Sequence, residues 1–379
     1  MFRHKGRLLL TQLVLIAAGA SFLMIMSLNS SLDLTLDNFF GRQRYDIIIG
    51  FNRDQRADRI ISLAQSAAGV EKAEIRVIQQ AGMFVEGQLL KEAGLSTTMW
   101  GIPSGSDFFT PLIVAGRWLA PEDGRAVVIT RETAEKNDIQ PGDTVTLDLG
   151  VWGKDQWQVV GLYEPVFVGG FAADSIYAPE ETLFQLAKKY NQASRVLIRT
   201  TSHDDAFTTE VTKNLKETFE SHSLKVSGSQ TQADLRATNE WQFSLVTSML
   251  LALSIIVALV GAIALMGALS IGVIERTKEI GVLRAIGARS HTILGIFVME
   301  GVLQGLISWL IAIPLSILVS PFVASQLGRI MFGATLDYQY NWLAVMIWLG
   351  IIVGVSILAS IMPARGATLI SVRDSLAYA

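Results

Sequence analysis

The sequence contains no cysteine and few charged residues. Its 379 residues include no Cys and only 4 His, and charged residues make up 17%. Without cysteine there is no disulfide, no thiolate nucleophile and no cysteine-ligated zinc. Soluble proteins contain about 25% charged residues, which is more than this chain has. Together with 50% hydrophobic residues and a mean hydropathy of +0.40, the low charge indicates a membrane protein with a substantial soluble part. The formal net charge of −3 argues against a nucleic-acid-binding protein.

The chain also lacks the short motifs that carry common chemistry. It has no G-x-x-x-x-G-K-[ST] sequence, and therefore no P-loop for ATP. It has no G-x-S-x-G nucleophile elbow. No pair among His4, His203, His222 and His291 has metal-binding spacing on one helix face, so we interpret all four as surface or flanking residues. We expect neither catalysis nor a bound cofactor or metal in this polypeptide.

Four apolar runs are long enough to cross a bilayer core of about 30 Å. Ala18-Gly19-Ala20 resembles a signal-peptide cleavage site, but the apolar run continues to Met26, which favours an uncleaved anchor. Pro314 and Pro321 are expected to kink or end the third span. The expected spans are residues 8–28, 242–274, 292–320 and 342–362.

Positive residues in the short flanks predict the orientation, because cytoplasmic loops are enriched in Lys and Arg. They cluster before the first span, between the second and third, and after the fourth, whereas the connection between spans three and four holds only Arg329. We therefore expect a multi-pass protein of the inner (plasma) membrane with both termini in the cytoplasm. Residues 1–7, 275–291 and 363–379 would lie inside, and residues 29–241 and 321–341 outside.

The long region between the first two spans is large enough for a core of its own. A strand–helix–strand pattern occupies residues 45–78 and returns at 195–226, which predicts two βαβ units of one split subdomain. Between them, about residues 84–179 form an insertion rich in strand signals, including 126–129, 144–147 and 157–161. The predicted fold is a membrane α-helical protein with an α+β extracytoplasmic domain.

A charged island, I-E-R-T-K-E-I-G-V-L-R-A-I-G-A, spans residues 274–288 between two apolar runs. Ile280, Leu283 and Gly287 recur at helical spacing. One interpretation is an ordinary loop helix between spans. The other is a coupling helix that docks into a partner, which then pushes on it.

The island resembles the signature of FtsX-like, MacB-type permeases, the type VII ABC transporter subunits that work by mechanotransmission. That family has an E-R-x-x-E-I-G-x-x-R-A-x-G-A pattern in the loop between its second and third spans. The external region adds Ala115-Gly116-Arg117-Trp118 and Pro141-Gly142-Asp143, which resemble the family's periplasmic core domain. The matching loop positions are Glu275, Arg276, Glu279, Ile280, Gly281, Arg284, Ala285, Gly287 and Ala288.

The resemblance implies partners that the chain itself does not contain. They are a separate ABC ATPase subunit, which would hold ATP and Mg, and a second permease copy in a homodimer or a pair of homologues. The implied function is export or extraction of an amphiphile (drug, peptide, lipid or lipoprotein), with no catalytic step in this chain. The alternative is a non-transporting regulator that activates a cell-wall hydrolase, and a periplasmic adaptor stays open as a further partner.

Residue roles follow from this hypothesis. Polar contacts to the ATPase are expected from Glu275, Arg276, Glu279 and Arg284, with Ile280, Leu283 and Gly287 on the packed face. Glu300 lies about two turns into the third span, where a carboxylate is costly, and is expected to reach Arg289 or lipid headgroups in a structural role. The alternative is a role in signal transmission or substrate contact. In the second span, Gly261, Gly267 and Gly272 offer a small-residue face for helix packing, which predicts a dimer seam formed by the second or the first span.

Overall fold

The computed structural model describes residues 2–84, 95–164, 175–187, 190–332 and 335–369, which form two compact units. One, the membrane unit, comprises Met1–Leu34, Gln242–Leu327 and Leu336–Ala379. The other, the external domain, comprises Thr35–Trp241 and Gly328–Thr335. The expected tail beyond residue 369 lies outside the described residues.

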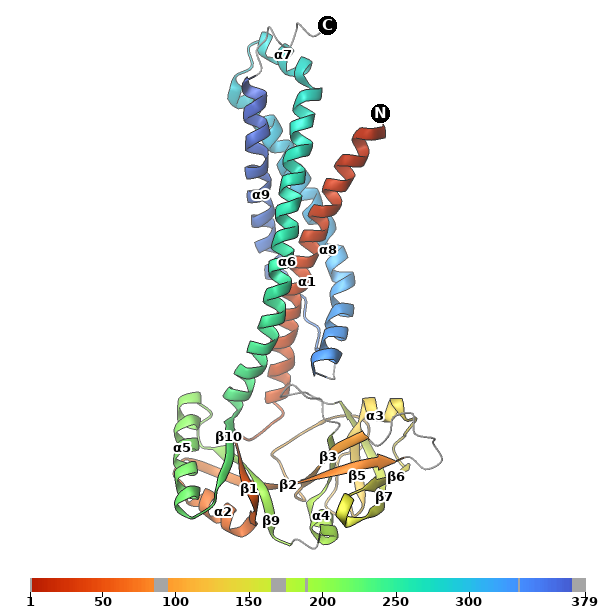
Figure 1. The fold of residues 1–379 in the computed structure, drawn as a ribbon, viewed down its shortest axis with the longest axis vertical. Helices are drawn as coiled ribbons and strands as arrows, with labels where there is room; N and C mark the ends of the chain where they lie inside the picture. The colour runs from red at the N-terminus through yellow and green to blue at the C-terminus, as the bar shows by residue number, and fades with distance from the viewer. Residues whose placement is uncertain (1, 85–94, 165–174, 188–189, 333–334, 370–379) are drawn as a thin grey trace. The chain divides into compact units, whose positions relative to one another are not determined.

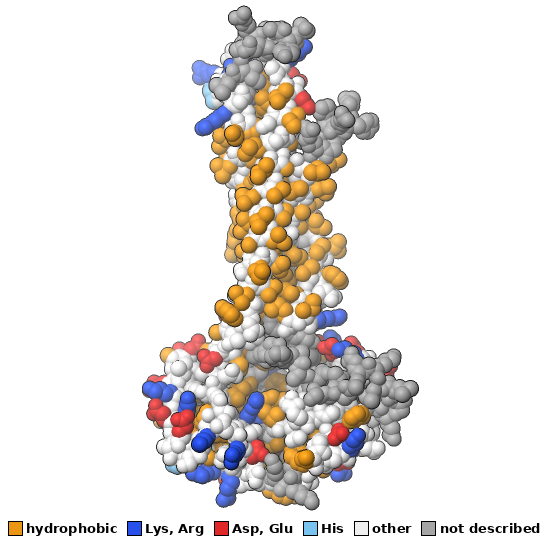
Figure 2. All heavy atoms as spheres, in the orientation of Figure 1, with side chains coloured by type: hydrophobic (Ala, Val, Ile, Leu, Met, Phe, Trp, Pro, Cys, Tyr) orange, Lys and Arg blue, Asp and Glu red, His pale blue; other side chains and the backbone are white. Residues whose placement is uncertain are grey.

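Four helices of the described chain are long and apolar enough to cross a membrane. They are α1 (Phe2–Phe40), α6 (Gln232–Glu275), α8 (Ser290–Phe332) and α9 (Trp342–Leu369). Apolar side chains cover the visible outer surface of these helices, as lipid contact requires (Figure 2). On the inner face, Phe22 stacks on Trp348 with ring centroids 4.9 Å apart. The chain is a multi-pass membrane protein.

The helices extend well beyond the expected spans of residues 8–28, 242–274, 292–320 and 342–362. Helix α1 continues to Phe40, and α6 already begins at Gln232. Helix α8 does not end at Pro314 or Pro321 but runs on to Phe332. Within that stretch, the hydroxyls of Ser316 and Ser320 donate to backbone carbonyls one turn earlier. Hydropathy marks where the lipid ends, whereas a helix ends where its hydrogen-bond ladder stops.

The first half of the external domain is the expected pair of βαβ units. They are β1 (Ile47–Arg56), α2 (Ala57–Ser66) and β2 (Val70–Phe84), then β9 (Gln192–Thr200), α5 (Asp205–Ser221) and β10 (Val226–Thr231). The strands are ordered β10-β1-β9-β2 with antiparallel neighbours, so the two units interlock in one sheet. Helices α2 and α5 pack on the same face (Figure 1). Their core includes Ile60, Leu215 and Phe219, buried against Ile49 and Val196.

The insertion forms the second half and shares a strand with the first. Strand β2 is 15 residues long, and its distal part, Val77–Met83, pairs with β3. The described sheet continues in the order β2-β3-β8-β5-β7-β4, with β6 pairing with β2 and β7. Trp157 is fully buried at the centre of this core. The elements are β3 (Leu95–Ile102), β4 (Leu112–Gly116), β5 (Ala126–Thr130), α3 (Arg131–Lys136), β6 (Thr144–Asp148), η1 (Gly150–Trp152), β7 (Lys154–Glu164), β8 (Ser175–Pro179) and α4 (Glu180–Ala187).

The Gly-Arg-Trp stretch closes the edge of this sheet. Gly116 has φ of +73°, and a Cβ there or at Gly161 would collide with the facing backbone. Arg117 follows and makes a bidentate pair with Asp123 at 2.7 Å. The carboxylate beside it raises the pKa of Arg117 further, and the guanidinium lowers the pKa of Asp123. The structure therefore explains the Gly and Arg of this motif: Gly116 allows two backbone segments to approach closely, and Arg117 forms an ion pair with Asp123.

Two charged residues are buried where the halves of the external domain meet. Arg76 is 2% exposed, and its Nη1 atom donates to Glu74 Oε2 at 3.1 Å and to the Ile75 carbonyl at 2.9 Å. Glu180 begins α4, and its Oε2 atom is buried with no hydrogen-bond partner among the described residues. Burial raises the pKa of Glu180 to about 8, because desolvation penalises the carboxylate.

Glu180 makes the stability of the external domain depend on pH. The folded carboxyl keeps its proton up to about pH 8, whereas the unfolded chain releases it near the ordinary value of 4.5. The free energy of unfolding therefore falls as pH rises between these values, by at most about 1.4 kcal/mol per pH unit. In E180Q this part of the slope disappears. Urea unfolding of the full-length chain in detergent at several pH values measures it, with exposed Glu135→Gln as the control; an unchanged slope in E180Q contradicts the assignment.

Candidate functional site

The charged island folds into a short helix between the second and third spans. Helix α7 (Thr277–Ala285) begins directly after α6 ends, and it ends at a left-handed glycine, Gly287, with φ of +99°. The Gly287 and Ala288 amides donate back to the Arg284 and Leu283 carbonyls at 3.0 and 2.9 Å. Glycine at this position closes the helix without strain, so the chain turns sharply from α7 into α8.

One face of α7 packs into the membrane unit. Ile280 and Gly281 are buried, and Ile280 lies in a cluster with Val273, Phe297 and Ala364. These neighbours come from α6, α8 and α9, so α7 is fixed to the ends of three spanning helices. Of the three residues expected on the packed face, Ile280 is buried and Leu283 half-buried, whereas Gly287 is exposed.

Arg284 points inward rather than outward. Its Nη2 atom donates to the Thr368 carbonyl near the end of α9 and lies 3.4 Å from Ser290 Oγ at the start of α8. The side chain is half-buried. Arg284 thus joins α7 to α8 and α9, and its expected contact to a partner stays a prediction. Sequence alone could not show this, because the carbonyl that it binds lies 84 residues away.

The opposite face of α7 is exposed and mixes charged with apolar side chains. Glu275, Arg276 and Glu279 are exposed, as expected for partner contacts. Beside them, Val282 and Ile286 are 55% and 77% exposed. The sequence analysis missed these two residues, although their spacing of four from Lys278 and from each other places them on one helical face. We call Glu275, Lys278, Glu279, Val282 and Ile286 the outer face of α7.

Glu300 is paired with Arg276. Arg276 Nη1 lies 3.1 Å from Glu300 Oε2, and both side chains are partly exposed. The sequence analysis expected Arg289 or lipid headgroups; the structure pairs Glu300 with Arg276, which directly follows α6, rather than with Arg289. The pair neutralises the carboxylate near the end of the span.

The three glycines of α6 differ in their surroundings. A Cβ at Gly261 would lie 2.8 Å from Leu15 Cδ2, so this position is filled by α1 of the same chain. A Cβ at Gly267 or Gly272 would meet no described atom within 4 Å. The dimer seam stays a prediction, with Gly267 and Gly272 as the open positions.

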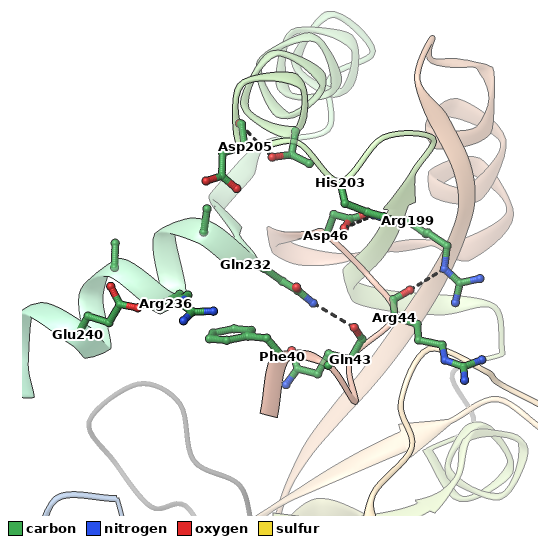
Figure 3. A pocket seen from close by; sticks show the side chains of 14 residues that line it. Phe40, Gln43, Arg44, Asp46, Arg199, His203, Asp205, Gln232, Arg236 and Glu240 are labelled. Atoms are coloured by element: carbon green, nitrogen blue, oxygen red, sulfur yellow. Dashed lines mark hydrogen bonds and ion pairs between the residues drawn. The ribbon is translucent and has the colours of Figure 1, made fainter. Parts of the chain in front are cut away.

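At the other ends of α1 and α6, polar contacts fasten both helices to the external domain (Figure 3). Arg236 of α6 pairs with Asp37 of α1 and with Glu240, each at 2.7 Å. Gln232 donates to the Gln43 and Tyr45 carbonyls of the chain leaving α1. The side chains around these contacts line a cavity of about 790 Å³ within the external domain. We call it the joint pocket.

Comparisons with known proteins agree with this architecture. Residues 8–215 match the MacB-like periplasmic core domain, and residues 251–372 match the FtsX-like permease C-terminal domain. The chain belongs to the FtsX/MacB-type ABC transporter permeases. The first match covers more than half of the chain and includes the whole first span, and the second contains α7, so the family assignment rests on both units.

Individual relatives of this permease are distant. The macrolide export ATP-binding/permease protein MacB of Aggregatibacter actinomycetemcomitans is 27% identical over 83% of this chain and 50% of its own length. An ABC transporter permease of Methanocaldococcus jannaschii, MJ1507, is 27% identical over 60% of this chain and 57% of its own length. The permease thus spans about half the length of the curated relatives that it matches. A crystal structure of the periplasmic region of MacB from Actinobacillus actinomycetemcomitans aligns with 54% of this chain and 97% of that one, at 14% identity and a TM-score of 0.39.

The described part of the permease offers no group of three or more His, Asp or Glu residues that could hold a metal ion. His203, one of the four histidines of the sequence, is exposed, and its Nδ1 atom lies 2.8 Å from Asp46 Oδ1. The structure brings together two other groups of residues: α7 with its outer face, and the side chains of the joint pocket.

Changing Arg284 to alanine should loosen α7 without unfolding the permease. A charged donor to a backbone carbonyl contributes about 1.5–3 kcal/mol, less where water reaches it. We expect amides of α7 and of the last turn of α9 to exchange hydrogen several-fold faster in R284A, as hydrogen-exchange mass spectrometry would measure. The exposed Arg289→Ala variant is the matched control, and equal exchange in the two variants would show that Arg284 does not fix the loop.

Proposed function

We propose that this permease converts ATP hydrolysis by a separate ABC ATPase into movement of its external domain. The observation that carries the proposal is the outer face of α7. It presents Val282 and Ile286 to solvent between Glu275, Lys278 and Glu279. Charges at this density keep the face out of the hydrocarbon core, and exposed apolar side chains rimmed by charges mark a protein-binding surface.

The packing of α7 supports transmission of a push. Ile280 is buried among residues of α6, α8 and α9, and Arg284 binds the end of α9. A force on the outer face therefore reaches three spanning helices at once rather than bending a loose loop. Helix α6 is one continuous element from the α7 end to Gln232, where it bonds to the segment between α1 and β1. ATP and Mg would be held by the ATPase.

We further propose that the stroke serves export or extraction of an amphiphilic molecule from the outer surface of the inner membrane, with both termini in the cytoplasm. The large external domain, with its second half inserted into the first, supports this reading because it offers surface beyond what anchoring needs. Two permease copies would flank the path of the amphiphile.

Acidic residues on the outer face should abolish ATPase binding. In the double variant V282D/I286D the apolar contacts are replaced by charges that the partner would have to desolvate. We expect the ATPase to co-purify with the native full-length permease and to be lost from this variant. Val151→Asp, at an exposed valine of the external domain, is the matched control. Retention of the ATPase by V282D/I286D, or its absence from the native permease under every nucleotide condition, contradicts the proposed function.

A bulky residue at Gly267 tests the second permease copy. Apart from its chain neighbours and the backbone of its own helix, no described atom lies within 4 Å of a Cβ there, so G267L should leave the folded monomer intact. If Gly267 lies in the seam, leucine separates the two helices and dimer cross-linking in the membrane falls several-fold. The control is Gly350→Leu on α9, another glycine with open space around its Cβ. Equal cross-linking of both variants would place the seam elsewhere.

A further inference from the structure

The two halves of the external domain share one strand, β2. It pairs with β9 of the first half from Val70 to Arg76, and with β3 of the second half from Val77 to Met83. The two ladders meet end to end, so β2 can bend between them without breaking the hydrogen bonds of either ladder. Contacts beside β2 therefore decide whether the halves can turn against each other.

Two such contacts lie close to the shared strand. Phe184 of α4 packs against the core of the first half, and Arg195 of β9 lies over the Trp100 ring of β3, 5.5 Å from its centroid. Strands β9 and β3 are both direct neighbours of β2. Contacts so near the line about which the halves would turn have a short lever arm, so they resist turning less than a contact farther away.

A third contact lies farther from β2. It is made by residues 106–110, which lie between β3 and β4 of the second half and which we call the clasp. The Arg44 amide donates to the Phe108 carbonyl at 2.9 Å, and the Thr110 amide donates to the Arg42 carbonyl at 3.1 Å. The clasp is thereby bonded to the chain that leads from α1 into β1. Strand β1 lies two strands from β2, or about 10 Å at ordinary strand spacing.

The first half presents two cations side by side to the clasp. Lys72 of β2 and Arg199 of β9 are directly opposite each other in the antiparallel ladder, and like charges at such a pair destabilise a sheet. Asp107 of the clasp contacts both of them. Its Oδ1 atom lies 2.7 Å from Lys72 Nζ, and its Oδ2 atom lies 3.0 Å from Arg199 Nη1. One carboxylate of the second half therefore joins two strands of the first.

Two acids of the first half also reach these cations. Glu74 Oε1 lies 2.9 Å from Lys72 Nζ, and Glu71 Oε1 lies 3.9 Å from Arg199 Nη1. Asp107 makes the shorter contact to each cation. Hydrogen bonds from Lys72 and from Arg199 lower the pKa of Asp107 to about 2, so its partners favour the charged form. The acids within the first half thus assist Asp107 but do not take its place.

A buried aromatic ring supports the ion pairs of the clasp. Phe108 is 0% exposed and lies in a cluster with Tyr45, which precedes β1, and Leu197 of β9. Its ring centroid is 5.2 Å from Lys72 Nζ and 4.7 Å from Arg199 Cζ, so both cations contact the ring as well as Asp107. Burial of an aromatic side chain is favourable in itself. The clasp therefore holds the first half by an apolar contact and by charge together.

We propose that the clasp fixes the second half of the external domain to the chain leaving α1, so that both halves follow a movement of α1 as one body. Without the clasp, the movement would pass through β1 and β9 to β2, which can bend where its two ladders meet. The inference deepens the proposed function by naming the contact that carries the stroke to the second half. It rests on that function for the movement of α1, whereas the clasp itself needs no ATPase.

Hydrogen-exchange mass spectrometry of the full-length permease in detergent measures the clasp directly. In D107N the clasp loses the negative charge that both cations contact, and the partly exposed site lets the variant fold. Peptides that contain the amides of Arg44 and Thr110 should exchange about fivefold faster, because these amides join the clasp to the chain from α1. The control is D155N, which removes an ion pair to Arg125 inside the second half. Equal exchange of these peptides in D107N and D155N overturns the proposal.

Distances between spin labels test whether the halves then turn against each other. The native chain has no cysteine, so labels can be attached to R44C beside β1, V151C on the second half and K216C on α5 of the first half, three exposed positions. Labelled permease is reconstituted with an excess of unlabelled permease, so that distances within one copy are measured. We expect D107N to broaden the distribution between positions 44 and 151 and to leave that between 44 and 216 unchanged.

Each other outcome contradicts the clasp. An unchanged distribution between positions 44 and 151 would show that β2 and α4 alone hold the second half. Broadening of both distributions would show that the chain from α1 has come away from the first half instead. The variant K72Q keeps the contact of Asp107 with Arg199 and should change the first distribution less than D107N does; a larger change would remove Asp107 from its central place. No ATPase is present, so failure of the clasp is distinguishable from failure of ATPase docking.

Discussion

The chain enters the external domain through α1 and leaves it through α6. The contacts between these two helix ends constrain the rest of the domain, because they hold its entry and exit together. Arg236 reaches across from α6 to Asp37 of α1, while Gln232 bonds to the segment that leads from α1 into β1. Strands β1 and β10, which continue the two helices, are hydrogen-bonded neighbours from Ile47 and Thr231 onward. The two connections therefore cannot move independently without breaking several hydrogen bonds.

Helix α7 is likewise held in place by contacts with other parts of the chain. This helix has only nine residues, too few to be stable alone. It is held by the burial of Ile280, by the glycine turn at Gly287 and by the bond from Arg284 to α9. Fixed in this way, α7 leaves its outer face exposed. Helix α7 and the joint pocket lie at opposite ends of α6, a single helix of 44 residues.

Much of this architecture was predictable because it depends on local patterns. The four spans follow from the length of the apolar runs, and the two βαβ units from strand and helix patterns that alternate along the chain. The family follows from the residues around Glu279 and Gly287. Sequence spacing cannot show which distant group lies nearest, so two contacts were not predicted: Arg284 binds the Thr368 carbonyl, and Glu300 pairs with Arg276 rather than with Arg289. Helix α8 was expected to kink or end at its prolines; it does not end there and continues to Phe332.

The sequence by itself determined the membrane character of the chain, its α+β external domain and its place among the FtsX/MacB-type permeases, since hydropathy, periodicity and short motifs are properties of neighbouring residues. The tertiary structure decided which face of α7 is open, which glycine of α6 is already filled by Leu15, and how Arg44 and Asp205 come to line one pocket. These two pocket residues are far apart in the chain: Arg44 lies in the segment between α1 and β1, and Asp205 begins α5. Only the interlocked pairing of β1 with β9 and β10 brings them to the same end of the sheet.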